Sequence, residues 1–188
     1  MVLTPQGPAV PPALVDACRR GDREAFRELY DASKDKVYSI ALYFFHGDAA
    51  AAADVTQQVF LKLMTSLHQF RGDARFSTWL YRMVVNVCLD RSRRARTGAL
   101  STDPAVFDRM PSSGSQEDDL ARAQMAAQVQ AAVSSLTPKI RAAVLLRYFE
   151  EMSYAEMASV LQCSVGTVAS RLNRAHELLA DRLKPIRR

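Results

Sequence analysis

Hydrophobic residues recur along most of this chain at intervals of three and four positions, which is the spacing of one buried face of an α-helix. No stretch alternates apolar and polar residues between turn signals, as a half-buried β-strand would. The pattern therefore predicts an all-α fold. The expected helices cover about residues 13–20, 23–44, 49–67, 77–95, 120–135 and 138–150, and two more lie between 153 and 182.

Interruptions of this pattern divide the chain into two small helical domains. Residues 1–12 contain four prolines, which is typical of a flexible tail. Between residues 98 and 119 the periodicity stops and Gly, Ser, Pro and Asp accumulate, as they do in linkers. A connection of this length is uncommon inside one domain. We therefore predict a helical domain over residues 13–97, a flexible linker over 98–119 and a second helical domain over 120–188.

The end of the second domain has the pattern of a helix-turn-helix. Ser153 and Glu156 have the spacing of a capping box, and Ser164 can cap another helix after a short turn. One side of that last helix is apolar, and the other carries Thr167, Ser170, Arg171 and Arg174. Hydroxyl and guanidinium groups on such a helix read base edges and hold phosphates in the DNA major groove. The alternative is an ordinary amphipathic helix with a solvated basic face.

The helix expected over residues 77–95 has an unusual polar face. A helical wheel brings together Trp79, Arg82, Asn86, Asp90 and Arg93. An exposed indole beside arginine and asparagine suits unstacked bases, because the ring stacks on any base and arginine neutralises the backbone. The alternative is that Trp79 fills the core while its polar neighbours are solvated.

The charge distribution favours a nucleic-acid partner more than the net charge of +5 does. Six arginines against one aspartate lie between residues 75 and 98, directly before an acidic segment. The N-terminus lacks the features of a signal peptide, and no apolar run is long enough to cross a bilayer. We therefore expect a soluble, cytoplasmic protein without membrane insertion.

Signs of catalysis or metal binding are missing from the sequence. Cys18, Cys88 and Cys163 lie far apart, without His or Cys partners at metal-ligand spacing. The three histidines are scattered, and there is neither a Gly-rich phosphate loop nor a nucleophile elbow. We expect no enzyme, no metal and no cofactor.

Three passages together resemble the extracytoplasmic-function (group IV) sigma factors of bacterial RNA polymerase. Residues 54–60 are similar to the family's polymerase-binding helix, and residues 76–91 to its promoter-melting helix. Residues 153–172 are similar to its upstream-element helix-turn-helix. The three occur in the family's order and across a polar linker.

The resemblance implies a role for each passage. The first domain would bind the β′ clamp helices of core RNA polymerase and hold the opened minus-10 element, and the second would lie on the β flap and read the minus-35 element. The implied polymerase-binding residues are Asp54, Val55, Gln57, Gln58 and Phe60. The implied minus-10 residues are Arg75, Phe76, Ser77, Trp79, Arg82, Asn86, Arg91 and Arg93. The implied minus-35 residues are Thr167, Ser170, Arg171 and Arg174.

The implied function is promoter-specific initiation of transcription, with core polymerase and promoter DNA as partners. Members of the family are commonly held inactive by an anti-sigma factor, which would be a further partner. Two alternatives stay open on sequence grounds: a two-domain helix-turn-helix regulator that acts without polymerase, and an anti-sigma-like interaction module.

Overall fold

The computed structural model describes residues 10–98, 125 and 128–183, and every regular element within them is a helix. The prediction of an all-α fold is confirmed. The tail segment 1–9, most of the predicted linker and the expected helix start near residue 120 lie outside the described residues.

Local residues explain where the first two helices begin and where the first one ends. Helix α1 spans Pro12–Arg19, with Pro at the first helical position, where its missing N–H costs no hydrogen bond. Gly21 then adopts a φ of +89°, a conformation that favours glycine. Helix α2 spans Arg23–Phe44 and begins as predicted at Asp22, whose carboxylate accepts hydrogen bonds from the backbone N–H groups of Glu24 and Ala25 at 2.9 and 3.1 Å.

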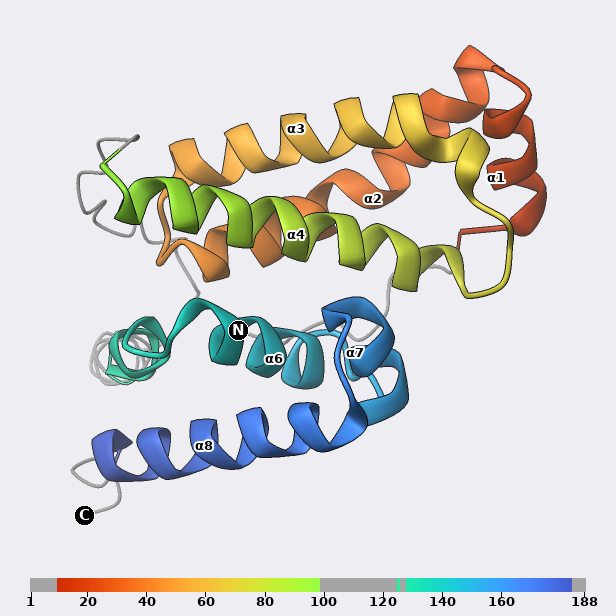
Figure 1. Ribbon diagram of the computed structural model, residues 1–188. Coiled ribbons are helices and arrows are strands. Elements are labelled where there is room, and N and C mark those ends of the chain that lie inside the picture. Colours follow the sequence, from red (N-terminus) through yellow and green to blue (C-terminus); the bar gives the residue numbers. More distant parts are fainter. Residues whose placement is uncertain (1–9, 99–124, 126–127, 184–188) are drawn as a thin grey trace, which may run out of the picture.

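Helices α3 and α4 run beside α2 (Figure 1). Helix α3 spans Ala49–Ser66 and is capped by Asp48, which accepts a hydrogen bond from the Ala51 N–H at 2.8 Å. A 3₁₀ turn, η1 (Leu67–Gln69), follows, so the loop expected from residue 68 begins two residues later. Helix α4 spans Phe76–Arg96 and starts one residue before the expected Ser77.

The C-terminal helices contain the predicted helix-turn-helix. Residues 128–134 are helical, and α6 (Pro138–Tyr148), α7 (Tyr154–Leu161) and α8 (Val165–Leu183) follow. The capping box of Ser153 and Glu156 is confirmed, and Ser164 Oγ accepts a hydrogen bond from the Thr167 N–H at 3.1 Å. Thr137, in contrast, makes no side-chain cap at the start of α6.

The N-terminal and C-terminal helices pack against each other around a shared core. Helix α6 lies against α2 and α4, α7 lies against α4, and α8 packs on the far side of α6 (Figure 1). One cluster of buried residues runs from Val15 through Phe44 and Cys88 to Leu146 and Leu172. The sequence pattern did not predict this contact between the two halves of the chain.

At the rim of this core, a few residues that helical spacing places on buried faces are more exposed than expected. Tyr30 and Tyr154 were expected on buried faces, but they are 39% and 38% exposed. Tyr30 packs edge-on against Phe60, with ring centroids 4.6 Å apart, and the Lys34 ammonium lies over its ring at 5.5 Å, so it lies at the rim of the core rather than inside it. Val165, expected on the apolar side of α8, is 49% exposed because it is the first residue of the helix.

Candidate nucleic-acid interface

Helix α4 divides its residues between the core and the surface. Leu80, Val84 and Val87 are buried, whereas Arg82, Asn86 and Arg93 are exposed. This split follows from the 3.6-residue period, which places apolar and polar positions on separate faces. We call Trp79, Arg82, Asn86 and Arg93 the α4 face.

Trp79 is half-buried at the edge of an aromatic cluster. Its ring centroid lies 5.4 Å from that of Phe70 and 6.1 Å from that of Phe76, and the two phenylalanine rings meet edge to face at 5.8 Å. Such ring pairs hold one another in fixed orientations. The two interpretations of Trp79 are therefore compatible, because part of the indole packs on the core and part stays accessible.

Two residues of the implied minus-10 set lie elsewhere. The side chain of Phe76 is a buried member of the aromatic cluster, only 7% exposed. Arg91 is turned toward α3, where its Nη1 lies 3.1 Å from the Asp54 carboxylate, and its guanidinium lies over the Phe45 ring. Neither side chain lies beside Arg82 and Asn86 on the exposed side of α4. Arg75 and Ser77 are exposed in the loop and first turn that lead into the helix.

The outer side of α3 is a separate surface. Asp54, Gln57 and Gln58 are exposed there, whereas Val55 and Phe60 are buried at 0% and 6% exposure. The expected direct contact of Val55 and Phe60 with a partner therefore does not fit their burial. Leu61 and Met64, which the sequence reasoning missed, are 53% and 60% exposed.

Helical spacing could have identified these two apolar residues. Leu61 and Met64 follow Gln57 at steps of four and three, which places all three on one side of α3. The buried positions Val55, Val59 and Leu63 lie on another side. We call Asp54, Gln57, Gln58, Leu61 and Met64 the α3 face, a polar surface with two large exposed hydrophobic side chains.

The recognition helix α8 presents its polar side to solvent. Ser170 and Arg174 are exposed, and Thr167 and Arg171 are half-buried. Arg174 pairs with Glu177 at 2.8 Å, and an Arg171 Nη1 donates to Cys163 Sγ at 3.7 Å. Both contacts are weak, because the first is an exposed ion pair and the second joins a guanidinium to a poor acceptor. We call Thr167, Ser170, Arg171 and Arg174 the α8 face.

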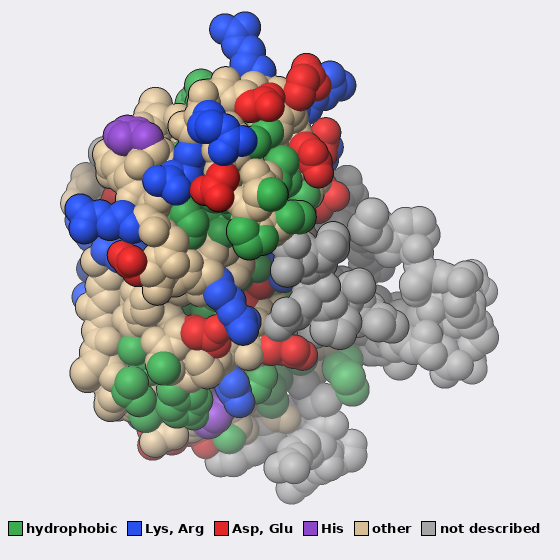
Figure 2. Space-filling view, turned by 90° about the vertical axis from the view of Figure 1, so that its right-hand side faces the viewer, with side chains coloured by type: hydrophobic (Ala, Val, Ile, Leu, Met, Phe, Trp, Pro, Cys, Tyr) green, Lys and Arg blue, Asp and Glu red, His purple; other side chains and the backbone are tan. Residues whose placement is uncertain are grey.

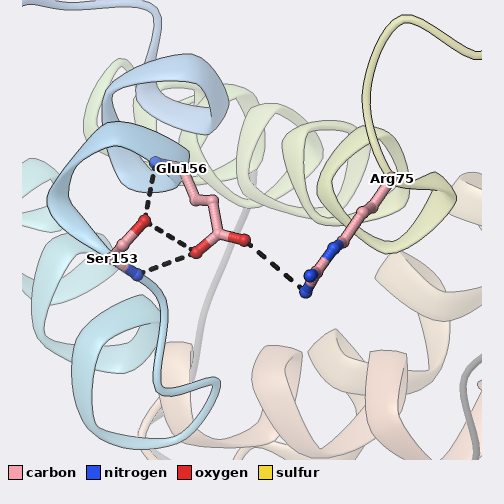
Figure 3. Close-up of polar contacts among 3 residues, drawn as sticks. All are labelled: Arg75, Ser153 and Glu156. Carbon is pink, nitrogen blue, oxygen red and sulfur yellow. Dashed lines mark hydrogen bonds and ion pairs between the residues drawn. The ribbon is translucent and has the colours of Figure 1, made fainter.

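The capping box of α7 faces the loop that leads into α4 (Figure 3). Ser153 donates its backbone N–H to Glu156 Oε2 at 2.9 Å, and the same carboxyl group lies 3.9 Å from Arg75 Nη1. The hydrogen bonds from Ser153, aided by the charge of Arg75, lower the pKa of Glu156. On this end of the molecule, Lys and Arg side chains are interspersed with Asp and Glu (Figure 2). Contacts with a polyanion there depend on individual side chains rather than on a continuous basic strip.

The described part of the chain was also searched for metal sites, disulfides and membrane-spanning helices. No group of His, Cys, Asp and Glu side chains within it could hold a metal ion. Cys18 and Cys88 are buried and Cys163 is half-buried, each with a free thiol. None of the described helices combines the length and apolarity of a membrane span.

Family models match both halves of the chain. The model of sigma-70 region 2 matches residues 29–97, and that of sigma-70 region 4 matches residues 126–179. The first match contains the α3 and α4 faces, and the second contains the helix-turn-helix.

Whole-length relatives agree with these models. The chain is 36% identical to the RNA polymerase sigma-H factor of Pseudomonas aeruginosa over 183 residues, which covers 93% of this chain and 94% of that one. It is 33% identical to the ECF RNA polymerase sigma-E factor of Escherichia coli over 182 residues, or 92% and 94% of the two chains. These matches do not favour a regulator that acts without polymerase.

Solved structures share the fold. The structure of CnrH in complex with the cytosolic domain of CnrY aligns with a TM-score of 0.67 and 25% identity, covering 92% of this chain and 96% of that chain. The sigma factor RpoE of Bartonella quintana, solved in complex with the anti-sigma factor NepR, aligns with a TM-score of 0.64 and 21% identity, over 85% and 96% of the chains.

Proposed function

Because this chain belongs to the extracytoplasmic-function sigma factors, which bind core RNA polymerase and direct promoter-specific initiation of transcription, we propose that its three exposed faces divide that work. The α4 face holds the opened minus-10 element, the α8 face reads the minus-35 element, and the α3 face binds the polymerase clamp. The observation that carries this assignment is that each face consists of exposed and half-buried side chains, while another side of the same helix is buried in the core.

The α4 face has the chemistry needed to hold single-stranded DNA. The accessible part of Trp79 offers a stacking surface, fixed from behind by Phe70 and Phe76. Arg82 and Asn86 lie one and two turns further along, where they can neutralise phosphate and hydrogen-bond to a base edge. Stacking on an aromatic ring contributes about 1–3 kcal/mol per base, which becomes available only when the duplex opens.

The α8 face has the chemistry needed to read duplex DNA. Thr167 and Ser170 lie near the N-terminus of the helix, where recognition helices contact base edges. Arg171 and Arg174 each supply a planar fork of donors, and each of their present partners can be exchanged for a guanine or phosphate at small cost. A bidentate arginine–guanine pair discriminates against a wrong base by about 1–3 kcal/mol.

The α3 face has the composition of a protein-docking surface. Leu61 and Met64 provide apolar area in the centre, with Asp54, Gln57 and Gln58 around them as a polar rim. Asp54 also pairs with Arg91 of α4, so a partner that draws on this carboxylate also acts on the helix that carries the minus-10 residues.

Further properties follow from this assignment. The chain performs no chemistry of its own, acts in the cytoplasm where polymerase is found, and is held inactive by an anti-sigma factor. The last point is supported by the likeness to RpoE, whose structure contains an anti-sigma factor, and to CnrH, which was solved with the cytosolic domain of CnrY.

Run-off transcription with core polymerase and a pool of genomic promoters tests the proposal. We expect the wild-type chain to select a subset of promoters, and Arg82→Ala combined with Asn86→Ala to lower the yield from all of them by tenfold or more, in line with the loss of about 1–3 kcal/mol for each base contact. Arg94→Ala is the matched control, because Arg94 is exposed on the same helix but points about 120° away from Arg82. Equal yields from the double variant and the control would contradict the assignment of the α4 face.

A further inference from the structure

The start of α3 lies beside the end of α4, and an ion pair joins the two helices there (Figure 1). Arg91 Nη1 of α4 lies 3.1 Å from Asp54 Oδ2 of α3. The two side chains differ in accessibility, because that of Asp54 is 56% exposed and that of Arg91 only 15%. The pair therefore connects a cation in the interior to an anion on the surface.

The guanidinium of Arg91 is held from inside the fold. It lies over the ring of Phe45, the residue that caps the end of α2, with 5.9 Å between the guanidinium carbon and the ring centroid. A cation at that distance is attracted to the face of the ring. The Nε of Arg91 is buried and meets no hydrogen-bond acceptor among the described residues. Within this part of the chain Asp54 is the anion that compensates the desolvated charge, so Arg91 has little freedom to leave it.

Arg91 projects from the side of α4 that is opposite to the α4 face. Residues 82 and 91 are nine positions apart, which at about 100° per residue places them about 180° apart around the helix. Val84 and Val87, which lie within about 40° of the direction of Arg91, are both buried. The resemblance implied that Arg91 binds the minus-10 element, whereas its burial and its pairing favour a role at the surface of α3.

Asp54 lies at one end of the α3 face. Gln58 and Leu61 follow it at steps of four and three, so the three residues share one side of the helix. A carboxylate has two oxygens that accept hydrogen bonds, so Asp54 can bind a donor of a partner while one oxygen stays with Arg91. A surface carboxylate without a fixed neighbour loses rotamer freedom when it binds. Arg91 removes part of that entropic cost in advance.

We propose that Arg91 is a positioning residue for polymerase docking, which holds the Asp54 carboxylate in the orientation in which a donor of the clamp binds it. Arg91 itself touches neither polymerase nor DNA. Phe45, Arg91 and Asp54 form a chain of contacts from the end of α2 through α4 to the α3 face, so three helices set the orientation of one surface carboxylate. This inference rests on the proposed assignment of the α3 face.

Binding of the full-length chain to core RNA polymerase tests this role through a double-mutant cycle. We expect Arg91→Ala to weaken binding about tenfold, which is within the usual range for residues in contact, and Asp54→Ala to weaken it at least as much. Because Arg91 acts only through Asp54, the combined variant should bind no more weakly than Asp54→Ala alone. Arg94→Ala is the matched control, since it removes an exposed arginine of the same helix and should bind like the wild type.

A reversed pair separates positioning from a merely structural link between α3 and α4. Asp54→Arg combined with Arg91→Asp restores opposite charges but presents a cation on the α3 face. We expect its urea midpoint to exceed those of the two single reversals, while its affinity for core polymerase stays about tenfold or more below the wild type. Recovery of stability and affinity together would show that the pair serves only the fold. Should the reversed pair not fold, Arg91→Lys gives the second readout, because it keeps the charge and should regain part of the affinity that Arg91→Ala loses.

The outcomes distinguish the role of Arg91 from the assignment of the α3 face. Wild-type affinity in Arg91→Ala, with weak binding by Asp54→Ala and intact helices by circular dichroism, would overturn the positioning role alone. Losses that add in the combined variant would also overturn it, because Arg91 would then contact the polymerase itself. Wild-type affinity in both Asp54→Ala and Leu61→Ala would instead overturn the assignment of the α3 face, on which the inference rests.

Discussion

At the scale of single residues, function in this chain depends on side chains that are only partly committed to the fold. Trp79 packs one side of its ring on Phe70 and Phe76 and leaves the rest accessible. Arg171 is half-buried, and its guanidinium makes a weak contact with Cys163 that is easily given up. A residue held in this way keeps its orientation at low entropic cost and can still exchange its neighbours for a base.

Replacement of Trp79 tests the stacking role at this scale. We expect Trp79→Ala to reduce promoter melting by roughly tenfold, from the loss of about 1–3 kcal/mol of stacking, and to change closed-complex binding much less. Trp79→Phe should retain part of the activity, because a ring remains. Permanganate reactivity of minus-10 thymines reports melting, and filter binding at low temperature reports the closed complex. Normal permanganate reactivity in Trp79→Ala would refute the role.

Replacement of Arg171 tests base reading by the α8 face. We expect Arg171→Ala to reduce the preference for one base at a single minus-35 position by about 1–3 kcal/mol, because one arginine fork reads about one base. Variants at that position should then be transcribed at similar levels. Asn173→Ala serves as the control, since residue 173 is exposed but lies about 200° around the helix from residue 171. Transcription from a panel of single-base upstream variants gives the ranking, and the same order of preference in all three proteins would exclude Arg171 as a reader.

At the scale of elements, the helix starts are the best-defined local features. Asp22, Asp48, Ser153 and Ser164 each accept a backbone N–H that the first turn leaves unpaired. The cap of α7 is also the place where the C-terminal helices approach the loop before α4, through Glu156 and Arg75. That ion pair is long and its arginine is 79% exposed, so the cap itself contributes far more to stability than the pair.

Removal of the α7 cap has a defined cost. We expect Ser153→Ala to lower the free energy of unfolding by about 1 kcal/mol, because the N–H of Glu156 loses its acceptor and the reciprocal bonds of the capping box are weakened. Ser159→Ala, an exposed change in the middle of the same helix, is the control and should leave stability unchanged or slightly raised. Urea unfolding followed by circular dichroism measures both, and equal midpoints would show that the cap contributes nothing.

At the scale of the whole molecule, two halves that each have DNA-facing helices share one buried core. His46, which follows α2 with a left-handed φ of 61°, lies where they meet. Its carbonyl accepts a hydrogen bond from Gln130, and burial together with the positive charge of Arg141 lowers its pKa from 6.5 to about 4. A proton on His46 is therefore disfavoured in the folded chain, in part by Arg141 of the C-terminal half.

Acidification should loosen this packing. Because the folded-state pKa is below the unfolded value, the contribution of neutral His46 to stability is complete above about pH 6.5. It is lost as the pH falls from 6.5 toward 4. The loss stays well under the limit of about 1.4 kcal/mol per pH unit, because the ring is only half-buried.

Denaturant unfolding at pH 7 and pH 5 measures this effect. We expect the stability difference between the two pH values to shrink in His46→Asn, since Asn tolerates the left-handed backbone and does not titrate. His68→Asn, at an exposed histidine, should retain the wild-type difference. A difference unchanged by His46→Asn would assign the acid sensitivity to other groups.

The sequence by itself determined the helices, their caps and the family. Periodicity and capping are local, and each depends on residues within a turn or two of one another, so Asp22, Ser153 and Ser164 could be identified as caps without a structure. The same locality placed Arg82 and Asn86 on the exposed side of α4. Helical spacing likewise groups Phe60 with the buried Leu63 and sets Leu61 on the other side of α3, although only the structure gives their exposure.

Only the tertiary structure decided which charged groups face solvent and how the two halves meet. Arg91 turns toward Asp54, and Arg141 passes between backbone carbonyls of both halves, although nothing in their local sequence distinguishes them from the exposed arginines. Apolar residues of α6 divide between two clusters: Ala142, Leu145 and Leu146 bury in the core shared with α2 and α4, whereas Val144 packs with Ala175 of α8. The physical reason is that burial is non-directional and acts between residues about a hundred positions apart, so its outcome is set by the shape of the assembled helices and is not encoded in any single stretch of sequence.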